Sequence, residues 1–156
     1  MDPPAGSKYR FGPHEIDDRQ VFRTTPLSFA IVNLRPTRPG HVLVCPKRNV
    51  KRFANLTVDE TCDLWITAKD IGVRLEQYHR ASSLIFIIQD GPHSGQTVPH
   101  VHIHIVPRRK VDFENNNDNT GMINAKNETF DLDIERKDRT MEVMAQEANE
   151  YRALFP

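Results

Sequence analysis

The sequence predicts an α+β fold: a mainly antiparallel sheet of about five strands, one long helix after the third strand, and a C-terminal helix. Short runs rich in β-branched residues recur between prolines and glycines, and two stretches have helical periodicity. Strands and helices do not alternate regularly, and no G-x-G-x-x-G motif is present. A doubly wound nucleotide-binding sheet is therefore not expected.

The first three strands are expected in the N-terminal third of the chain. Residues 21–24 and 27–33 are short apolar runs, and Pro26 separates them because proline cannot donate to a strand ladder. Residues 34–40 contain two prolines and a glycine, which favour a hairpin loop. A third strand is expected at residues 41–46.

Two helices are predicted, the first from a capping box and periodicity and the second from periodicity alone. Thr57 and Glu60 form a capping-box pattern, and the apolar residues that follow are spaced for an amphipathic helix to about residue 79. Trp65 on this helix is expected in the core or in an interface. A second helix should begin near Thr140 and pack a Met-rich face on the body of the protein or on a partner; that face comprises Met141, Met144, Ala145, Ala148 and Tyr151.

The segment from Pro99 to Arg109 carries the strongest chemical signal. Three histidines, His100, His102 and His104, alternate with β-branched residues, so in a strand the imidazoles share one face and the branched side chains the other. We expect Pro107 to end this strand. It should pair antiparallel with an apolar strand at residues 83–89, across a Gly-rich loop at residues 90–98.

Three interpretations of the histidine face are open. The imidazoles could be surface residues, or they could bind a transition metal. A zinc site would need a further ligand or an open water position, and Cys45 and Cys62 are far away in sequence and form no close pair, so we expect no resident metal. In the third interpretation, a neutral imidazole attacks a phosphoryl group and forms a phosphoramidate that water cleaves.

The chain resembles the histidine triad (HIT) superfamily, whose signature is His-x-His-x-His-x-x with apolar x. Additional segments resemble its fragile histidine triad branch of dinucleoside polyphosphate hydrolases. The resemblance covers roughly residues 9–113 and resumes in about the last fifteen residues, which is more specific than the triad alone. Its segments are R-F-G at residues 10–12, L-S-F-A-I-V-N at 27–33, P-G-H-V-L-V-C-P at 39–46, Q-D-G-P at 89–92 and G-Q-T-V at 95–98.

The resemblance implies a HIT-like fold and hydrolysis of diadenosine polyphosphates, with the triphosphate preferred, to AMP and ADP. His102 would attack the α-phosphorus, while His100 and His104 would bind phosphate oxygens and fix the tautomer of the central ring. Mg or Mn would arrive with the substrate phosphates. The implied substrate-binding residues are His14, Asn33, His41, Gln89, Gly95, Gln96, Thr97, Val98 and His104.

Several of these residues also have a purely structural interpretation. His14 could be a surface histidine in a turn, and the Asn33 amide could cap the end of a strand. The Gly-rich loop could be no more than a hairpin connection, although its position directly before the histidines favours phosphate binding. Phe11 and Ile16 could be packing residues, or they could lie beside the nucleotide base as the resemblance implies.

Composition restricts the class of protein. The chain has 156 residues with 21 basic and 21 acidic side chains, which gives no global field to attract nucleic acid or a membrane surface. We expect a flexible tail at residues 1–8 and a single domain at residues 9–156, with a mobile polar loop at about residues 112–135. Two cysteines expected to be free thiols, with no signal peptide or long apolar run, indicate the cytoplasm, with the nucleus as a second compartment.

The resemblance also implies a homodimer with the long helix at its interface. The sequence departs from the animal members in one respect, because no tyrosine lies between Tyr78 and Tyr151 and their phosphorylation site is missing. Two functions compete with hydrolysis: a nucleotide-binding signalling protein with slow turnover, and an adenosine phosphoramidase of the same superfamily. Pro107 and Arg108, where the phosphoramidase branch typically has glycines, argue against the latter.

Overall fold

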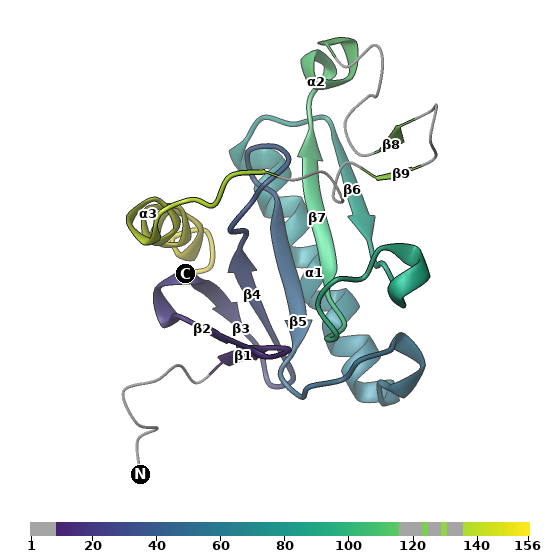
Figure 1. Ribbon diagram of the computed structural model, residues 1–156. Helices are drawn as coiled ribbons and strands as arrows, with labels where there is room; N and C mark the ends of the chain where they lie inside the picture. The colour runs from purple at the N-terminus through teal and green to yellow at the C-terminus, as the bar shows by residue number, and fades with distance from the viewer. Residues whose placement is uncertain (1–8, 116–122, 125–128, 131–135) are drawn as a thin grey trace.

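The computed structural model describes residues 9–115, 123–124, 129–130 and 136–156, and it confirms the α+β architecture (Figure 1). A five-stranded antiparallel sheet has the strand order β3-β4-β5-β7-β6. The first three predicted strands are present within a residue of their expected ends. The strands are β3 (Val21–Thr24), β4 (Ser28–Val32), β5 (Val42–Pro46), β6 (Ser83–Ile87) and β7 (Ile103–Arg108).

The prediction for the histidine strand was wrong at both ends. β7 begins at Ile103, so His100 and His102 precede it. Pro46, the last residue of β5, has no N–H to donate, and the Val101 N–H bonds instead to the Val50 carbonyl at 2.7 Å. At its other end, β7 continues through Pro107, which lies opposite Leu84 of β6.

Pro107 is tolerated because β7 is paired on only one side at that point. The ladder between β5 and β7 ends at Ile105, and beyond it β7 pairs with β6 alone. The missing N–H of a proline costs no ladder bond on an unpaired side.

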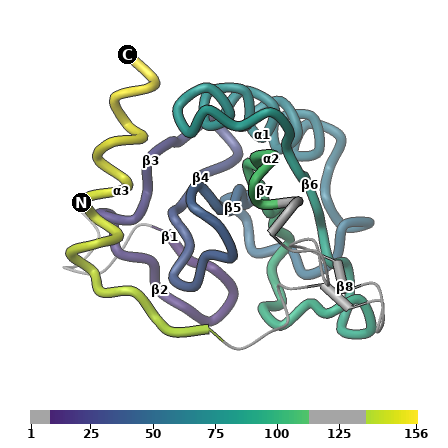
Figure 2. The backbone as a smooth tube through the Cα atoms, turned by 90° about the horizontal axis from the view of Figure 1, so that it is seen from above, coloured from purple at the N-terminus to yellow at the C-terminus, as the bar shows by residue number. Residues whose placement is uncertain are grey.

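Both predicted helices are present. α1 (Val58–Tyr78) starts with the expected capping box, in which the Thr57 hydroxyl accepts from the Glu60 N–H at 3.1 Å and the Glu60 carboxylate accepts from the Thr57 N–H at 2.8 Å. α3 (Met141–Arg152) is capped by the Thr140 hydroxyl. Viewed from above, α1 runs along one face of the sheet and α3 lies beside β3 (Figure 2).

Several short elements were not predicted. An N-terminal hairpin pairs β1 (Tyr9–Phe11) with β2 (His14–Ile16) through a turn whose Gly12 has a φ of +60°, a value that favours glycine. The tail predicted at residues 1–8 and most of the loop predicted at about 112–135 lie outside the described residues. The remaining short elements that were not predicted are η1 (Asp18–Gln20), η2 (Phe53–Asn55), η3 (Pro92–Ser94), α2 (Lys110–Asn115), β8 (Ile123–Asn124) and β9 (Thr129–Phe130).

The sheet separates two apolar clusters, and this separation places the histidines. Val101, Ile103 and Ile105 are buried in the cluster on the α1 side, as the alternation predicts. The other face is covered by the N-terminal hairpin, whose Phe11 and Ile16 join the second cluster. The histidine rings lie on this hairpin side, where Phe11 contacts two of them.

Two further sequence expectations can be compared with the fold. Cys45 is buried, Cys62 is exposed, and both are free thiols. Trp65 is 37% exposed and is therefore not a core residue, which leaves the predicted interface role open. Among the described helices, none combines the length and apolar character needed to cross a membrane.

Candidate functional site

Four histidines and one phenylalanine form a buried cluster under the N-terminal hairpin. The ring centroids of His102 and His104 are 4.8 Å apart, and those of His41 and His104 are 5.2 Å apart. The Phe11 ring meets His102 edge-on at 4.8 Å. Three of the imidazoles come from the segment that leads into and forms β7, and His41 comes from the residue before β5, the neighbouring strand. The cluster is therefore built across two adjacent strands and closed by a third element.

A backbone hydrogen bond fixes the tautomer of His102. Its Nδ1 lies 2.7 Å from the carbonyl oxygen of His100, which can only accept, so Nδ1 carries the proton. The ring is neutral, as its lowered pKa requires, and its Nε2 therefore keeps a free lone pair. This is the protonation state of an imidazole nucleophile.

His100 has a structural role that is visible in its contacts. Its Nδ1 accepts from the Gly12 N–H at 2.9 Å, and its Nε2 donates to the Pro46 carbonyl at 2.8 Å. Both nitrogens are used, so the ring ties the turn of the hairpin to the end of β5. What His100 offers to the site is its backbone carbonyl.

His41 and His104 form a relay whose protons can be assigned. The Thr37 N–H donates to His41 Nδ1 at 3.0 Å, so His41 carries its proton on Nε2. Two atoms lie near that Nε2, namely Asn33 Nδ2 at 3.1 Å and His104 Nδ1 at 3.0 Å, and only the second can accept. His104 consequently carries its own proton on Nε2.

The Nε2–H of His104 is a buried donor with no partner among the described residues. A buried unpaired donor is costly, and such groups are found where a ligand supplies the acceptor. Because its ring packs edge-on against that of His102, with centroids 4.8 Å apart, this donor belongs to the same site as the His102 lone pair. The pair offers a lone pair and a hydrogen-bond donor side by side, which suits attack on a phosphoryl group whose oxygens need donors.

Burial keeps the whole cluster uncharged at neutral pH. Desolvation lowers the pKa of His102 to about 4 and, together with the nearby Arg136 guanidinium, that of His41 to about 3. It also lowers the pKa of His104 well below the ordinary value, and that of His100 to a lesser degree. His102 therefore stays neutral over a wide pH range.

The Gly-rich loop is rigidly held beside the cluster. The Asp90 carboxylate accepts from the Phe53 N–H at 2.9 Å and pairs with Arg52 at 3.0 Å. The Gln96 amide accepts from the Gly91 N–H at 2.7 Å and donates to the carbonyls of Lys51 and Val98. Both hydrogens of the Gln96 amide are thus used within the loop, and a phosphate contact by this amide would require one of them to be released.

The remaining predicted substrate residues lie at different depths. Val98 packs against the apolar cluster under the hairpin, and Gln89 is buried. His14 and Thr97 are exposed, and Gly95 is partly exposed with a φ of +91°. The Asn33 oxygen accepts from the Arg35 N–H at 2.9 Å, which is the turn-capping interpretation, while its amide nitrogen lies against His41. Among these residues, Asn33 contacts the relay through its amide nitrogen and His41.

Comparison with known proteins is consistent with this geometry. Residues 14–111 match the HIT domain. The chain belongs to the HIT domain family. It is 56% identical over 153 residues to the Arabidopsis thaliana bifunctional bis(5'-adenosyl)-triphosphatase/adenylylsulfatase FHIT, covering 96% of this chain and 85% of that protein. It is 49% identical to the bis(5'-adenosyl)-triphosphatase of Dictyostelium discoideum, covering 93% and 91% respectively.

Solved HIT structures share the fold. The Caenorhabditis elegans NitFhit protein superimposes with a TM-score of 0.77 at 40% identity, covering 99% of this chain, which spans only 31% of that chain. The diadenosine triphosphate hydrolase of Plasmodium falciparum, solved in complex with cyclomarin A, gives a TM-score of 0.74 at 32% identity, covering 93% of this chain and 82% of that one.

Metal ligation was an alternative use of the histidines. In the described ranges, no group of three or more His, Cys, Asp or Glu side chains is arranged to hold a metal ion. Within this HIT domain, both nitrogens of His100 are occupied by backbone groups, so this ring offers no free lone pair to a metal.

Sequence reasoning missed the backbone partners that set the tautomers. The Thr37 N–H, the Gly12 N–H and the Pro46 carbonyl carry no side-chain signature, and any residue except proline could supply the first two. The position of Gly12 before Pro13 did offer a turn signal that would have predicted the hairpin.

Proposed function

We propose that this HIT protein hydrolyses diadenosine polyphosphates, preferring the triphosphate, to AMP and ADP through an adenylyl-histidine on His102. The observation that carries the proposal is the free Nε2 lone pair of His102, whose other nitrogen is held by the His100 carbonyl. The identity of 56% and 49% to proteins named bis(5'-adenosyl)-triphosphatase supports this substrate class.

The reaction would proceed in two displacements. His102 Nε2 attacks the α-phosphorus, the bond from phosphorus to the bridging oxygen breaks, and ADP leaves with that oxygen. Water then attacks the same phosphorus, the P–N bond breaks, and AMP is released with one oxygen from water. The Nδ1–H bond to the His100 carbonyl stabilises the positive charge that the ring acquires in the first step.

His104 would act as the adjacent donor. Its buried Nε2–H would find its acceptor in a non-bridging oxygen of the α-phosphoryl group, whose negative charge is shared during displacement. Asn33, Gln89 and the Gly-rich loop would hold the nucleosides and the outer phosphates. A divalent cation, Mg or Mn, would come with the polyphosphate and neutralise part of its charge.

We also propose that the protein works as a homodimer in the cytoplasm. β6 is an edge strand of the five-stranded sheet, and an open edge favours pairing with a second copy. Phe86 on β6 and Trp65, Ile66 and Val73 on α1 are exposed apolar side chains on neighbouring elements. Burying them in a two-fold interface would remove this apolar surface from water. The free thiols support a reducing compartment.

The Arabidopsis relative suggests a second substrate. Its name includes adenylylsulfatase, and the same displacement at His102 would cleave adenosine phosphosulfate to AMP and sulfate. The leaving group differs, but the attacked adenylyl group is the same, so the two activities need only one nucleophile.

A substrate panel tests the proposal. Purified protein is incubated with diadenosine triphosphate, diadenosine tetraphosphate, adenosine phosphosulfate and adenosine phosphoramidate, and the products are separated by chromatography. The highest kcat/KM is expected with the triphosphate, yielding equal amounts of AMP and ADP. Preference for the phosphoramidate would assign the chain to the competing enzyme class. Binding of the dinucleotide without AMP formation would identify it as a signalling protein.

A further inference from the structure

The segment that leads into α3 is bound along the loop between β4 and β5 (Figure 1). The Arg139 N–H donates to the Leu34 carbonyl at 3.0 Å, and Arg136 Nε donates to the Arg35 carbonyl at 3.0 Å. Arg35 also forms an ion pair with Asp138. Residues more than one hundred positions apart are thereby fixed to each other, at the loop that supports His41.

Arg139 is the centre of this attachment. Its guanidinium donates from Nε to the Asn33 carbonyl at 3.1 Å, adds a second bond from a terminal nitrogen, and pairs with Glu147 at 2.8 Å. Only 19% of its side chain and 17% of that of Glu147 are exposed. An ion pair at this depth is poorly screened by solvent, and removing one partner leaves the other charge unpaired.

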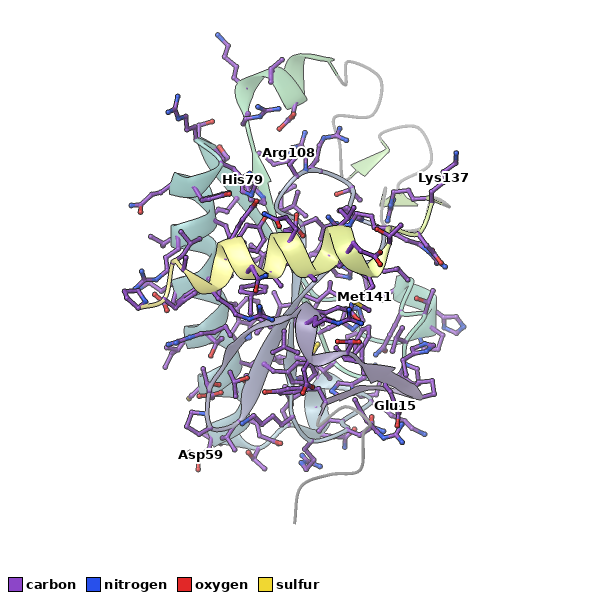
Figure 3. All side chains as sticks on the ribbon, turned by 90° about the vertical axis from the view of Figure 1, so that its left-hand side faces the viewer. Glu15, Asp59, His79, Arg108, Lys137 and Met141 are labelled. Atoms are coloured by element: carbon purple, nitrogen blue, oxygen red, sulfur yellow. The ribbon has the colours of Figure 1, made fainter. Side chains whose placement is uncertain are left out.

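Glu147 lies near the buried Tyr151 hydroxyl, whose pKa is raised by burial and by this carboxylate. The same hydroxyl lies 2.8 Å from His79 Nε2, at the end of α1. His79 lies next to α3 in Figure 3, which also shows Lys137 on the segment leading into that helix. Arg139 therefore joins α3, through Glu147, to the backbone carbonyl of Asn33.

Asn33 and Thr37 are loop residues that contact the His41 ring. Asn33 Nδ2 lies 3.1 Å from His41 Nε2, and the Thr37 N–H donates to His41 Nδ1. His41 donates its Nε2–H to Nδ1 of His104, so His104 carries its own proton on Nε2, in a ring whose centroid is 4.8 Å from that of His102. The position of this loop thus decides which nitrogen of His104 carries the proton.

We infer that Arg139, held by Glu147, is a positioning residue that fixes the loop from Asn33 to Thr37 and so sets the tautomers of His41 and His104. Its contribution to turnover rests on the proposed hydrolase function, but its effect on the tautomers does not. Burial, with a smaller contribution from the positive charge of Arg139, lowers the pKa of His41 and keeps this ring neutral.

The test compares Arg139→Gln with Arg152→Gln. Arg152 also attaches α3 to the body, through the carbonyls of Val21 and Asp18, but none of its bonds to the described residues reaches the histidines. Imidazole nitrogen NMR of the ligand-free protein should show His41 and His104 as Nε2–H tautomers in the wild type and in Arg152→Gln. In Arg139→Gln both rings should become tautomer mixtures, while His102 keeps its Nδ1–H.

Turnover of diadenosine triphosphate by Arg139→Gln should fall about ten- to hundredfold, as expected for a slightly misplaced group, with Arg152→Gln near the wild type. If Arg139→Gln does not fold, Arg139→Lys is used, because its ammonium can still reach Glu147 or Asn33; the same shifts should appear at smaller amplitude. Unchanged tautomers in the folded variant, or equal effects of Arg152→Gln, would overturn the inference. Inactivity of the wild type towards every dinucleotide would refute the proposed hydrolase instead, leaving the NMR result valid.

Discussion

His41 donates its Nε2–H to Nδ1 of His104 across 3.0 Å, and this one bond determines which nitrogen of His104 carries the proton. The donor in turn depends on the Thr37 N–H at the far side of the His41 ring. A buried, neutral chain of this kind has a single consistent assignment of protons.

Replacement of His41 should therefore act through His104. We expect His41→Ala to lower kcat about tenfold to a hundredfold, because His104 can then adopt either tautomer. His41→Gln keeps an N–H donor and most of the volume and should retain more activity. Steady-state kinetics on both variants, with thermal melting to check folding, test this. Equal loss in the two variants would mean that packing, not proton placement, is what His41 supplies.

His102→Ala should lower kcat about a thousandfold or more, as for the loss of a nucleophile, while dinucleotide affinity stays broadly intact. Gln146→Ala is the control, because Gln146 is exposed on α3 and its side chain bonds to Glu150 on the same helix. Affinity is measured by calorimetry with a non-hydrolysable analogue. Substantial turnover by His102→Ala would remove His102 from the role of nucleophile.

Acid should destabilise the protein below the ordinary histidine pKa. His102 has its pKa lowered from 6.5 to about 4 by burial, so the unfolded chain binds a proton that the folded one excludes. Its contribution is fully present above pH 6.5 and is lost as the pH falls towards 4, an effect on the order of 3 kcal/mol for this residue alone.

Urea unfolding at several pH values measures this dependence. His102→Gln removes the titrating group, so its free energy of unfolding should decline less steeply with acid than that of the wild type. Parallel curves for the two proteins would contradict the assignment of a buried, neutral His102.

The stereochemical course separates a histidine intermediate from direct attack by water. Two displacements invert phosphorus twice, so a substrate made chiral at the α-phosphorus by sulfur and oxygen isotopes should give AMP with net retention. Oxygen from labelled water should enter AMP and not ADP. Net inversion, or label in ADP, would show that water attacks directly.

Sequence alone predicted the fold and the histidine side of the sheet, because alternation and capping are local properties. Val101, Ile103 and Ile105 lie in the core on the face opposite the histidines as expected, and Thr57 and Glu60 form the expected cap. The start of β7 was missed because it depends on what β5 can offer as a partner at Pro46. The start of β7 is thus set by the neighbouring strand β5, and the residue pattern of β7 alone does not indicate it.

The connections within the site were also beyond sequence reasoning. Nothing in the neighbourhood of Arg139 indicates that its guanidinium binds the Asn33 carbonyl, 106 positions earlier. Backbone donors such as the Thr37 N–H cannot be predicted from sequence either, since almost every residue has one. Only the folded chain brings these groups together.

The acceptor for the His102 proton is the carbonyl of His100, two residues earlier in the same chain. Side-chain substitution at position 100 cannot delete this oxygen. A His100→Ala variant would lose the ties to Gly12 and Pro46 yet keep the group that orients the nucleophile. The orientation of the His102 ring is therefore insensitive to substitution of the His100 side chain. Substitutions at position 100 would weaken the attachment of the N-terminal hairpin before they affected the proposed reaction.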